Sequence, residues 1–141
     1  MRIGLVACCK EKLFQLASAE DLYQSQLFRL SRQYVERHCD SWYILSAKYG
    51  LLQPKVEISP YDFTLMDAGM EYRRSWANRC NLRLQDIRTP ETVFVALAGE
   101  RYRLALEYMV RLPYEAPMRG LYIGQQIAWL KRELAIPGGE G

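Results

Sequence analysis

Polar residues with clear chemical potential follow two apolar runs of the chain. Lys10 and Lys12 come directly after the first run, and lysine ammonium groups are compact point charges that bind anions such as phosphate. Ser46, Lys48 and Tyr49 end the second run and lead into a turn. We expect these side chains to face a ligand. The alternative is a solvated loop at the two lysines and, at Tyr49, simple packing beneath the following loop.

The segment Pro60-Tyr61-Asp62-Phe63-Thr64 supplies an acidic residue beside an aromatic one. Proline stiffens the approach to Tyr61 and Asp62, and Thr64 can hydrogen-bond locally. A carboxylate in this position can act as an acid, a base or a group that orients water. Asp62 is therefore the first candidate catalytic residue, with Lys10 as the second. An Asx turn or a helix cap is the alternative role for Asp62.

Amide and guanidinium groups form two further candidate sets. Gln125 and Gln126 offer donors and acceptors that match the hydrogen-bonding edge of a nucleobase, with exposed glutamines on a helix as the alternative. A later helix combines arginines with Tyr72 and Trp76, which suggests a basic, aromatic surface that contacts phosphates. A plain solvated helix face is the alternative there. The arginines assigned to nucleic-acid binding are Arg73, Arg74 and Arg79.

The composition of the chain and the motifs that it lacks exclude several classes of function. The chain has 141 residues, and its net charge of +3 is too small to identify a partner. It has no phosphate-binding glycine and lysine motif and no dinucleotide-binding glycine motif. The four cysteines lack metal-ligand spacing, so we expect reduced thiols, no metal and no cofactor. No leader and no apolar run of spanning length is present, so we expect a cytoplasmic protein without a membrane segment.

The elements that must position these residues alternate between strands and helices. Apolar runs predict buried strands at 1–8, 42–47 and 92–97, and Pro117 makes 114–118 an edge strand. Helical spacing predicts helices at 26–38, 68–84, 102–110 and 123–134. The order predicts an α/β fold: a single domain over 1–136 with a mostly parallel open sheet and helices on both faces. Residues 137–141 are expected to form a short flexible tail. Ligands of such sheets bind at the carboxyl ends of the strands.

Three motifs carry a family resemblance: LSAKYGLL at 45–52, PYDFTL at 60–65 and IGQQ at 123–126. With them the chain resembles a bacterial and phage family of unknown function. It is also similar to the peroxide-stress YaaA-like proteins, which bind DNA. The order of its elements is distantly similar to that of uracil-DNA-glycosylase-type domains. The polar positions that match the family pattern are Cys8, Lys10, Lys12, Tyr23, Ser25, Ser46, Lys48, Tyr49, Tyr61, Asp62, Thr64, Gln125 and Gln126.

These observations predict a protein that binds or acts on nucleic acid or nucleotides. The leading hypothesis is that it cleaves the N-glycosidic bond between a base and its sugar. Asp62 would orient water or stabilise an oxocarbenium-like centre, and the two lysines would hold phosphate. Tyr49, Tyr61 and Gln125 would hold a base taken out of the stack. The expected partner is DNA, RNA or a free nucleotide. Alternatives are a non-enzymatic DNA-binding module that uses the arginine-bearing helix, or a small-molecule nucleoside or nucleotide enzyme.

Overall fold

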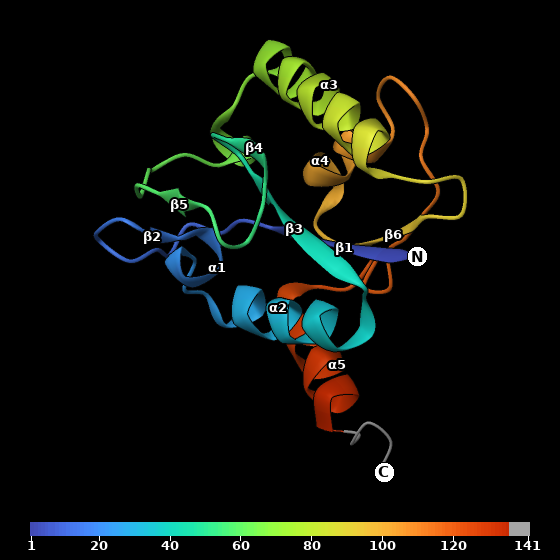
Figure 1. The fold of residues 1–141 in the computed structure, drawn as a ribbon. Helices are drawn as coiled ribbons and strands as arrows, with labels where there is room; N and C mark the ends of the chain where they lie inside the picture. Colours follow the sequence, from blue (N-terminus) through green and yellow to red (C-terminus); the bar gives the residue numbers. More distant parts are fainter. Residues whose placement is uncertain (136–141) are drawn as a thin grey trace.

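The central strand of the sheet is the first apolar run of the sequence. In a computed structural model, which describes residues 1–135, strand β1 (Arg2–Ala7) is buried from Ile3 to Val6 (Figure 1). A strand in the middle of a sheet with both faces covered must be apolar on both sides, as this one is. The tail predicted at 137–141 lies outside the described residues.

The main sheet has the order β4-β3-β1-β6-β7. β1 pairs in parallel with β3 (Ser41–Ser46) and with β6 (Val93–Leu97), and β7 (Tyr114–Glu115) runs parallel to β6 at the edge. The exception is β4 (Gly50–Leu52), which folds back against β3 in the antiparallel direction. The prediction of a mixed α/β fold with a mostly parallel sheet is therefore confirmed, while the antiparallel strand was not foreseen.

Helices lie on the two faces of this sheet (Figure 1). α2 (Gln26–His38) and α5 (Ile123–Ala135) pack together on one face, and α3 (Met70–Ile87) lies on the other. α2 begins where the sequence predicts, because the Ser25 hydroxyl accepts a hydrogen bond from the Phe28 amide at 3.0 Å. Within the described part of the chain, no helix is long and apolar enough to cross a membrane.

The closest packing of helix on sheet occurs at Gly4. A Cβ atom placed on Gly4 would lie 2.5 Å from the Cγ1 atom of Val35 and 2.6 Å from its Cβ atom. Only glycine leaves room for the helix at this distance. The fully buried Val35 therefore fixes α2 directly over the middle of β1.

A second, small sheet lies beyond the carboxyl end of β1 (Figure 1). It pairs β2 (Ala17–Ser18) with β5 (Glu57–Ile58), and the short helix α1 (Ala19–Leu22) follows β2. An isolated bridge between Lys12 and Tyr23 closes the loop that leaves β1. The sequence predicts only loops here, because a strand of two residues has no measurable periodicity. We call residues 9–25 with 53–58 the flap.

The prediction of a helix at 102–110 is right only for its first part. The chain forms α4 (Glu100–Arg103) and a 3-10 turn, η2 (Leu104–Leu106), and then leaves helical geometry. Asn81 of α3 gives the physical reason, since its side-chain amide donates to the carbonyls of Ala105 and Val110, both at 2.9 Å. Its oxygen also accepts from the Val110 amide at 3.3 Å. These contacts replace the bonds that a continuous helix would make.

Candidate functional site

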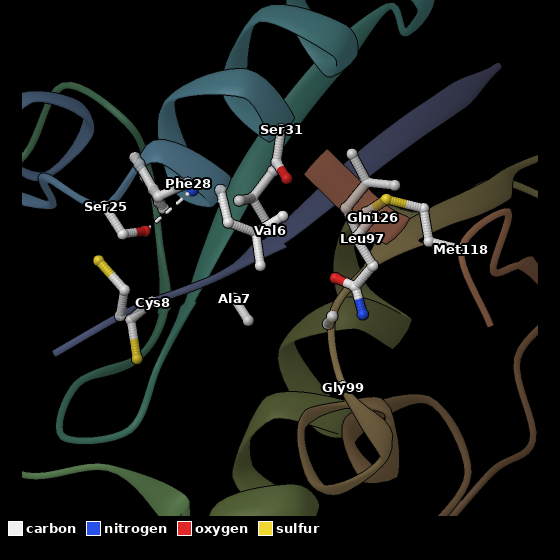
Figure 2. A pocket seen from close by; sticks show the side chains of 13 residues that line it. Val6, Ala7, Cys8, Ser25, Phe28, Ser31, Leu97, Gly99, Met118 and Gln126 are labelled. Carbon is white, nitrogen blue, oxygen red and sulfur yellow. Dashed lines mark hydrogen bonds between the residues drawn. The ribbon is translucent and has the colours of Figure 1, made fainter. Parts of the chain in front are cut away.

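The order of the strands creates a crevice between β1 and β6. From β1 the chain passes to β3 on one side, and from β6 it passes to β7 on the other. Loops therefore diverge at the carboxyl ends of these two strands, which is where open α/β sheets bind ligands. A cavity of about 80 Å³ lies there, with Val6, Phe28 and Leu97 among its apolar walls (Figure 2). Ser25, Cys8 and Gln126 are among its polar walls.

A larger groove, of about 580 Å³, lies between the loop after β1 and the segment 60–62. It gathers both candidate catalytic residues, Lys10 and Asp62, together with Lys12 and Tyr61. Glu11, Leu13, Phe14 and Pro60 complete its lining. The structure thus brings the pair Lys10 and Lys12 together with the pair Tyr61 and Asp62, about 50 positions further along the sequence. We call this hollow the lysine groove.

Lys12 lies over the aromatic floor of the lysine groove. Its ammonium nitrogen is 4.4 Å from the ring centre of Tyr61 and 5.7 Å from that of Tyr23. The same nitrogen donates to the Lys10 carbonyl at 3.2 Å. A cation over the face of an aromatic ring is held by the quadrupole of the ring. Lys12 is therefore fixed in place, whereas the side chain of Lys10 is exposed.

Asp62 is exposed at the rim of the lysine groove. The capping role that sequence reasoning left open for it is filled by Thr64 and Asp67 at the short 3-10 turn η1 (Leu65–Asp67). The Thr64 hydroxyl donates to the Asp67 carboxylate at 3.2 Å. Thr64 is accordingly placed in this turn and is not among the residues that line the groove. The carboxylate of Asp62 is left accessible to a ligand.

A buried cluster of hydroxyl groups supports Tyr61 from below. The Tyr61 hydroxyl lies 2.7 Å from both the Tyr23 hydroxyl and the Ser46 Oγ atom. Ser46 Oγ in turn accepts from the Tyr49 amide at 3.1 Å. Burial raises the pKa of Tyr61 and of Tyr23 well above the ordinary value for tyrosine. Both phenols therefore stay protonated, and the ring of Tyr61 is held rigidly at the groove.

Cys8, the residue that follows β1, makes a second set of buried polar contacts nearby. Its thiol donates to the Tyr102 hydroxyl at 3.5 Å, and its sulfur accepts from the Ala47 amide at 3.3 Å. The Tyr102 hydroxyl also accepts from the Leu65 amide at 3.2 Å, and burial raises its pKa. Cys8 thus binds the carboxyl ends of β1 and β3 together and lines the small cavity. Sequence reasoning missed Tyr102, which it placed only in a core helix.

Tyr49 and Lys48 extend the aromatic surface beyond Tyr61. The rings of Tyr49 and Tyr61 meet edge to face, with centres 5.6 Å apart. The Lys48 ammonium lies 5.2 Å from the ring centre of Tyr49, and both of these residues are exposed. Lys12, Tyr61, Tyr49 and Lys48 form a row in which each member contacts the next. Two adjoining rings with a cation at each end suit a ligand that carries both phosphate and a flat base.

The two glutamines occupy different positions. The side-chain oxygen of Gln125 accepts from the Tyr122 amide at 2.9 Å and so caps the start of α5. Gln126 donates to the Leu121 carbonyl at 2.8 Å and lines the small cavity, where its amide is drawn beside Gly99 (Figure 2). Neither glutamine lines the lysine groove. The amide that faces a cavity is therefore that of Gln126.

The expected basic and aromatic surface on α3 is only partly present. Trp76 is completely buried and donates its indole N–H to the Ser46 carbonyl at 2.7 Å, so its prediction as a surface residue is wrong. Arg73 donates to the Ala68 carbonyl at 2.8 Å, while Arg74 and Arg79 are exposed. Burial raises the pKa of the neighbouring Cys80 to about 12. Trp76 serves to attach α3 to the end of β3.

The fold and these cavities define an open, mostly parallel α/β protein whose hollows gather at the carboxyl edge of the sheet. Residues 3–132 match a family of unknown function, DUF6884, and the chain belongs to that family. A relative is the uncharacterized protein YfjM of Bacillus subtilis (strain 168), which is 28% identical over an alignment that covers 77% of each chain. The expected membership of an uncharacterised family is thus confirmed.

Proposed function

We propose that the protein acts on a nucleic acid or a nucleotide and hydrolyses an N-glycosidic bond in the lysine groove. The observation that carries this proposal is the convergence of Lys10, Lys12, Tyr61 and Asp62 on one hollow. The lysines supply charge for phosphate, the Tyr61 ring supplies a face for a base, and Asp62 supplies an accessible carboxylate. These are the groups that cleavage of a base from its sugar requires.

The proposed reaction assigns each group a step. The bond between the sugar carbon and the base nitrogen breaks, and positive charge grows on the sugar ring. The Asp62 carboxylate stabilises that charge and accepts a proton from the water whose oxygen bonds to the sugar carbon. The base leaves with the bonding electron pair and takes up a proton from solvent. Lys12, with Lys10, holds the phosphate, and Tyr61 with the neighbouring Tyr49 ring holds the base.

The first test measures binding and base release on the same oligonucleotides. We expect fluorescence anisotropy to show binding of DNA or RNA that weakens as salt rises, because phosphate contacts release counterions. Mass spectrometry of the supernatant should then detect a free base. A lack of binding to any polymer at low salt, combined with a thermal shift by a mononucleotide, would place the substrate among free nucleotides. A lack of response to both would contradict the proposal.

Asp62→Asn tests the catalytic step. We expect this variant to bind the substrate as the unmodified protein does and to lose at least about 100-fold in turnover, the usual size of a general-base contribution. Glu11→Gln is the matched control, because it removes one negative charge from the same groove. An equal loss of turnover in both variants, or a loss of binding in Asp62→Asn, would overturn the role assigned to Asp62.

A further inference from the structure

A third hollow, of about 490 Å³, lies at the carboxyl ends of β6 and β7. Two arginines, Arg103 and Arg119, line it together with Glu100, Gly99, Gly120 and Gln126. It shares no lining residue with the lysine groove. It does share Ala98, Gly99, Met118 and Gln126 with the small cavity at the β1–β6 crevice. We call this third hollow the arginine pocket.

Arg103 is held in place at the end of β6. Its Nη1 atom donates to the Ala98 carbonyl at 2.8 Å, which fixes the guanidinium against the end of β6. Its Nε atom is one of two buried side-chain polar atoms within residues 1–135 that have no hydrogen-bond partner. Because the Nε atom is out of reach of solvent, a ligand in the arginine pocket would contact the terminal nitrogens of Arg103.

Arg119 is fixed on the other side of the arginine pocket. Its Nη2 atom donates to the Tyr114 hydroxyl at 2.9 Å, and its guanidinium carbon lies 5.5 Å from the centre of that ring. These contacts hold the side chain in place and leave its other N–H groups for a ligand. The lining therefore carries two guanidinium charges against the single carboxylate of Glu100, and its net charge is positive.

The glycines keep the backbone of the arginine pocket accessible. A Cβ atom added to Gly99 or to Gly120 would meet no atom within 4 Å. Gly120 also has a φ of 82°, a conformation that side chains with a Cβ atom rarely adopt. A ligand can thus approach the chain closely on both sides of the hollow. Gln126 lies where the arginine pocket meets the small cavity, so its amide is in reach of a group that spans the two.

We propose that the arginine pocket binds a phosphoryl group. Guanidinium groups donate paired N–H bonds in a planar fork that matches phosphate, and two of them suit an anion with more than two acceptor oxygens better than a carboxylate. The remainder of the ligand extends toward the apolar walls of the small cavity. Two sources share this chemistry: the phosphate of a free mononucleotide and the backbone of a polynucleotide. The proposal stands independently of catalysis in the lysine groove.

The test is isothermal titration calorimetry of the full chain with pyrophosphate, a mononucleotide and a short single-stranded oligonucleotide. We expect Arg119→Gln and Arg103→Gln each to weaken binding of at least one of these probes by about 10-fold or more. Arg101→Gln is the matched control, since Arg101 belongs to the same short helix, contacts Met66 and does not line the pocket. Tighter binding of the mononucleotide than of the oligonucleotide identifies a free nucleotide as the source, and the reverse identifies a polymer.

Two results would overturn the proposal: no binding of any of the three probes, or binding that all three variants weaken equally. Because Arg103 also holds the Ala98 carbonyl, its replacement can disturb folding, so Arg119→Gln decides the outcome if Arg103→Gln unfolds. Asp62→Asn separates the two sites. It should leave binding of pyrophosphate unchanged even where it abolishes base release, so failure of catalysis and failure of the phosphoryl site give different results.

Discussion

Tyr61 links the exposed lysine groove to the buried part of the molecule. Its ring lies beneath the Lys12 ammonium, while its hydroxyl lies between those of Tyr23 and Ser46. A ring with one polar end in a satisfied network and one apolar face toward a groove cannot rotate away from that groove without breaking hydrogen bonds. The hydrogen bonds of the buried Tyr61 hydroxyl therefore also fix the orientation of the ring that lines the lysine groove.

Tyr61→Phe should lower the free energy of unfolding by about 1–2 kcal/mol, because the variant leaves two buried hydroxyl groups with one partner fewer. It should also change the response to alkali. The folded pKa of Tyr61 is raised by burial, so the unfolded chain loses its proton first and stability falls as pH rises above about 10. Urea unfolding measured between pH 8 and 11 should show a smaller alkaline loss in the variant.

Tyr49→Phe is the control for this measurement, since the Tyr49 hydroxyl is not part of the buried cluster and its ring is exposed. Its alkaline response should match that of the unmodified protein. If Tyr61→Phe and the unmodified protein lose the same stability between pH 8 and 11, the Tyr61 hydroxyl is not buried as described.

At the scale of elements, the approach of α2 to β1 sets the floor of the small cavity. Gly4→Ala should lower the free energy of unfolding by about 1–3 kcal/mol, because the new Cβ atom would lie 2.5 Å from Val35 and force the helix away from the strand. Thermal unfolding measures this loss. Replacing Val35 by alanine as well should not restore stability fully, because the Cβ atom of residue 35 lies 2.6 Å from the new group.

Gly124→Ala in α5 is the matched control, since an added Cβ atom there meets nothing within 4 Å. It should leave stability unchanged or raise it slightly, as alanine favours helix more than glycine does. Equal effects of the two substitutions would show that α2 does not press on β1 at Gly4.

The elements also show how far sequence reasoning reaches. β1, β3, β6, α2, α3 and α5 follow from apolar runs and helical spacing, because each is long enough to show its own period. The helix predicted at 102–110 ends early because Asn81, more than 20 residues earlier, takes over its main-chain bonds. Lys10 could be selected as a polar residue after a strand and Asp62 from its place after Pro60 and Tyr61. No motif signals Arg103 and Arg119, which line one hollow only because β6 pairs with β7.

At the scale of the whole molecule, ion pairs between side chains hold the flap, which carries about half of the lysine groove. Glu20 is buried in the flap, and its carboxylate pairs with Arg32 of α2 at 3.3 Å and with Lys55 at 2.8 Å. The Ala19 amide donates to the Val56 carbonyl at 2.7 Å beside these pairs. The Arg32 pair holds the flap against α2, and the contacts of Lys55 and Ala19 hold the two segments of the flap together.

Glu20→Gln should therefore loosen the flap and lower the free energy of unfolding by about 1–2 kcal/mol, a moderate cost because Arg32 keeps its pairs with Asp21 and Glu36. Hydrogen exchange at the Ala19 amide should become faster than in the unmodified protein. Glu36→Gln, which removes only an exposed pair, should change neither quantity measurably. A protected Ala19 amide in Glu20→Gln would show that the flap is held by other contacts.

The two outer strands of the main sheet have a consequence for how copies of the chain meet one another. β4 has three residues, all of them buried, and β7 has two, of which the exposed Glu115 pairs with Arg2 at 3.0 Å. A long bare strand at the edge of a sheet is a template on which a second molecule can add its own strand. Edges this short leave almost no main-chain ladder to extend, so crowding should not drive this protein toward fibrous aggregation through its sheet.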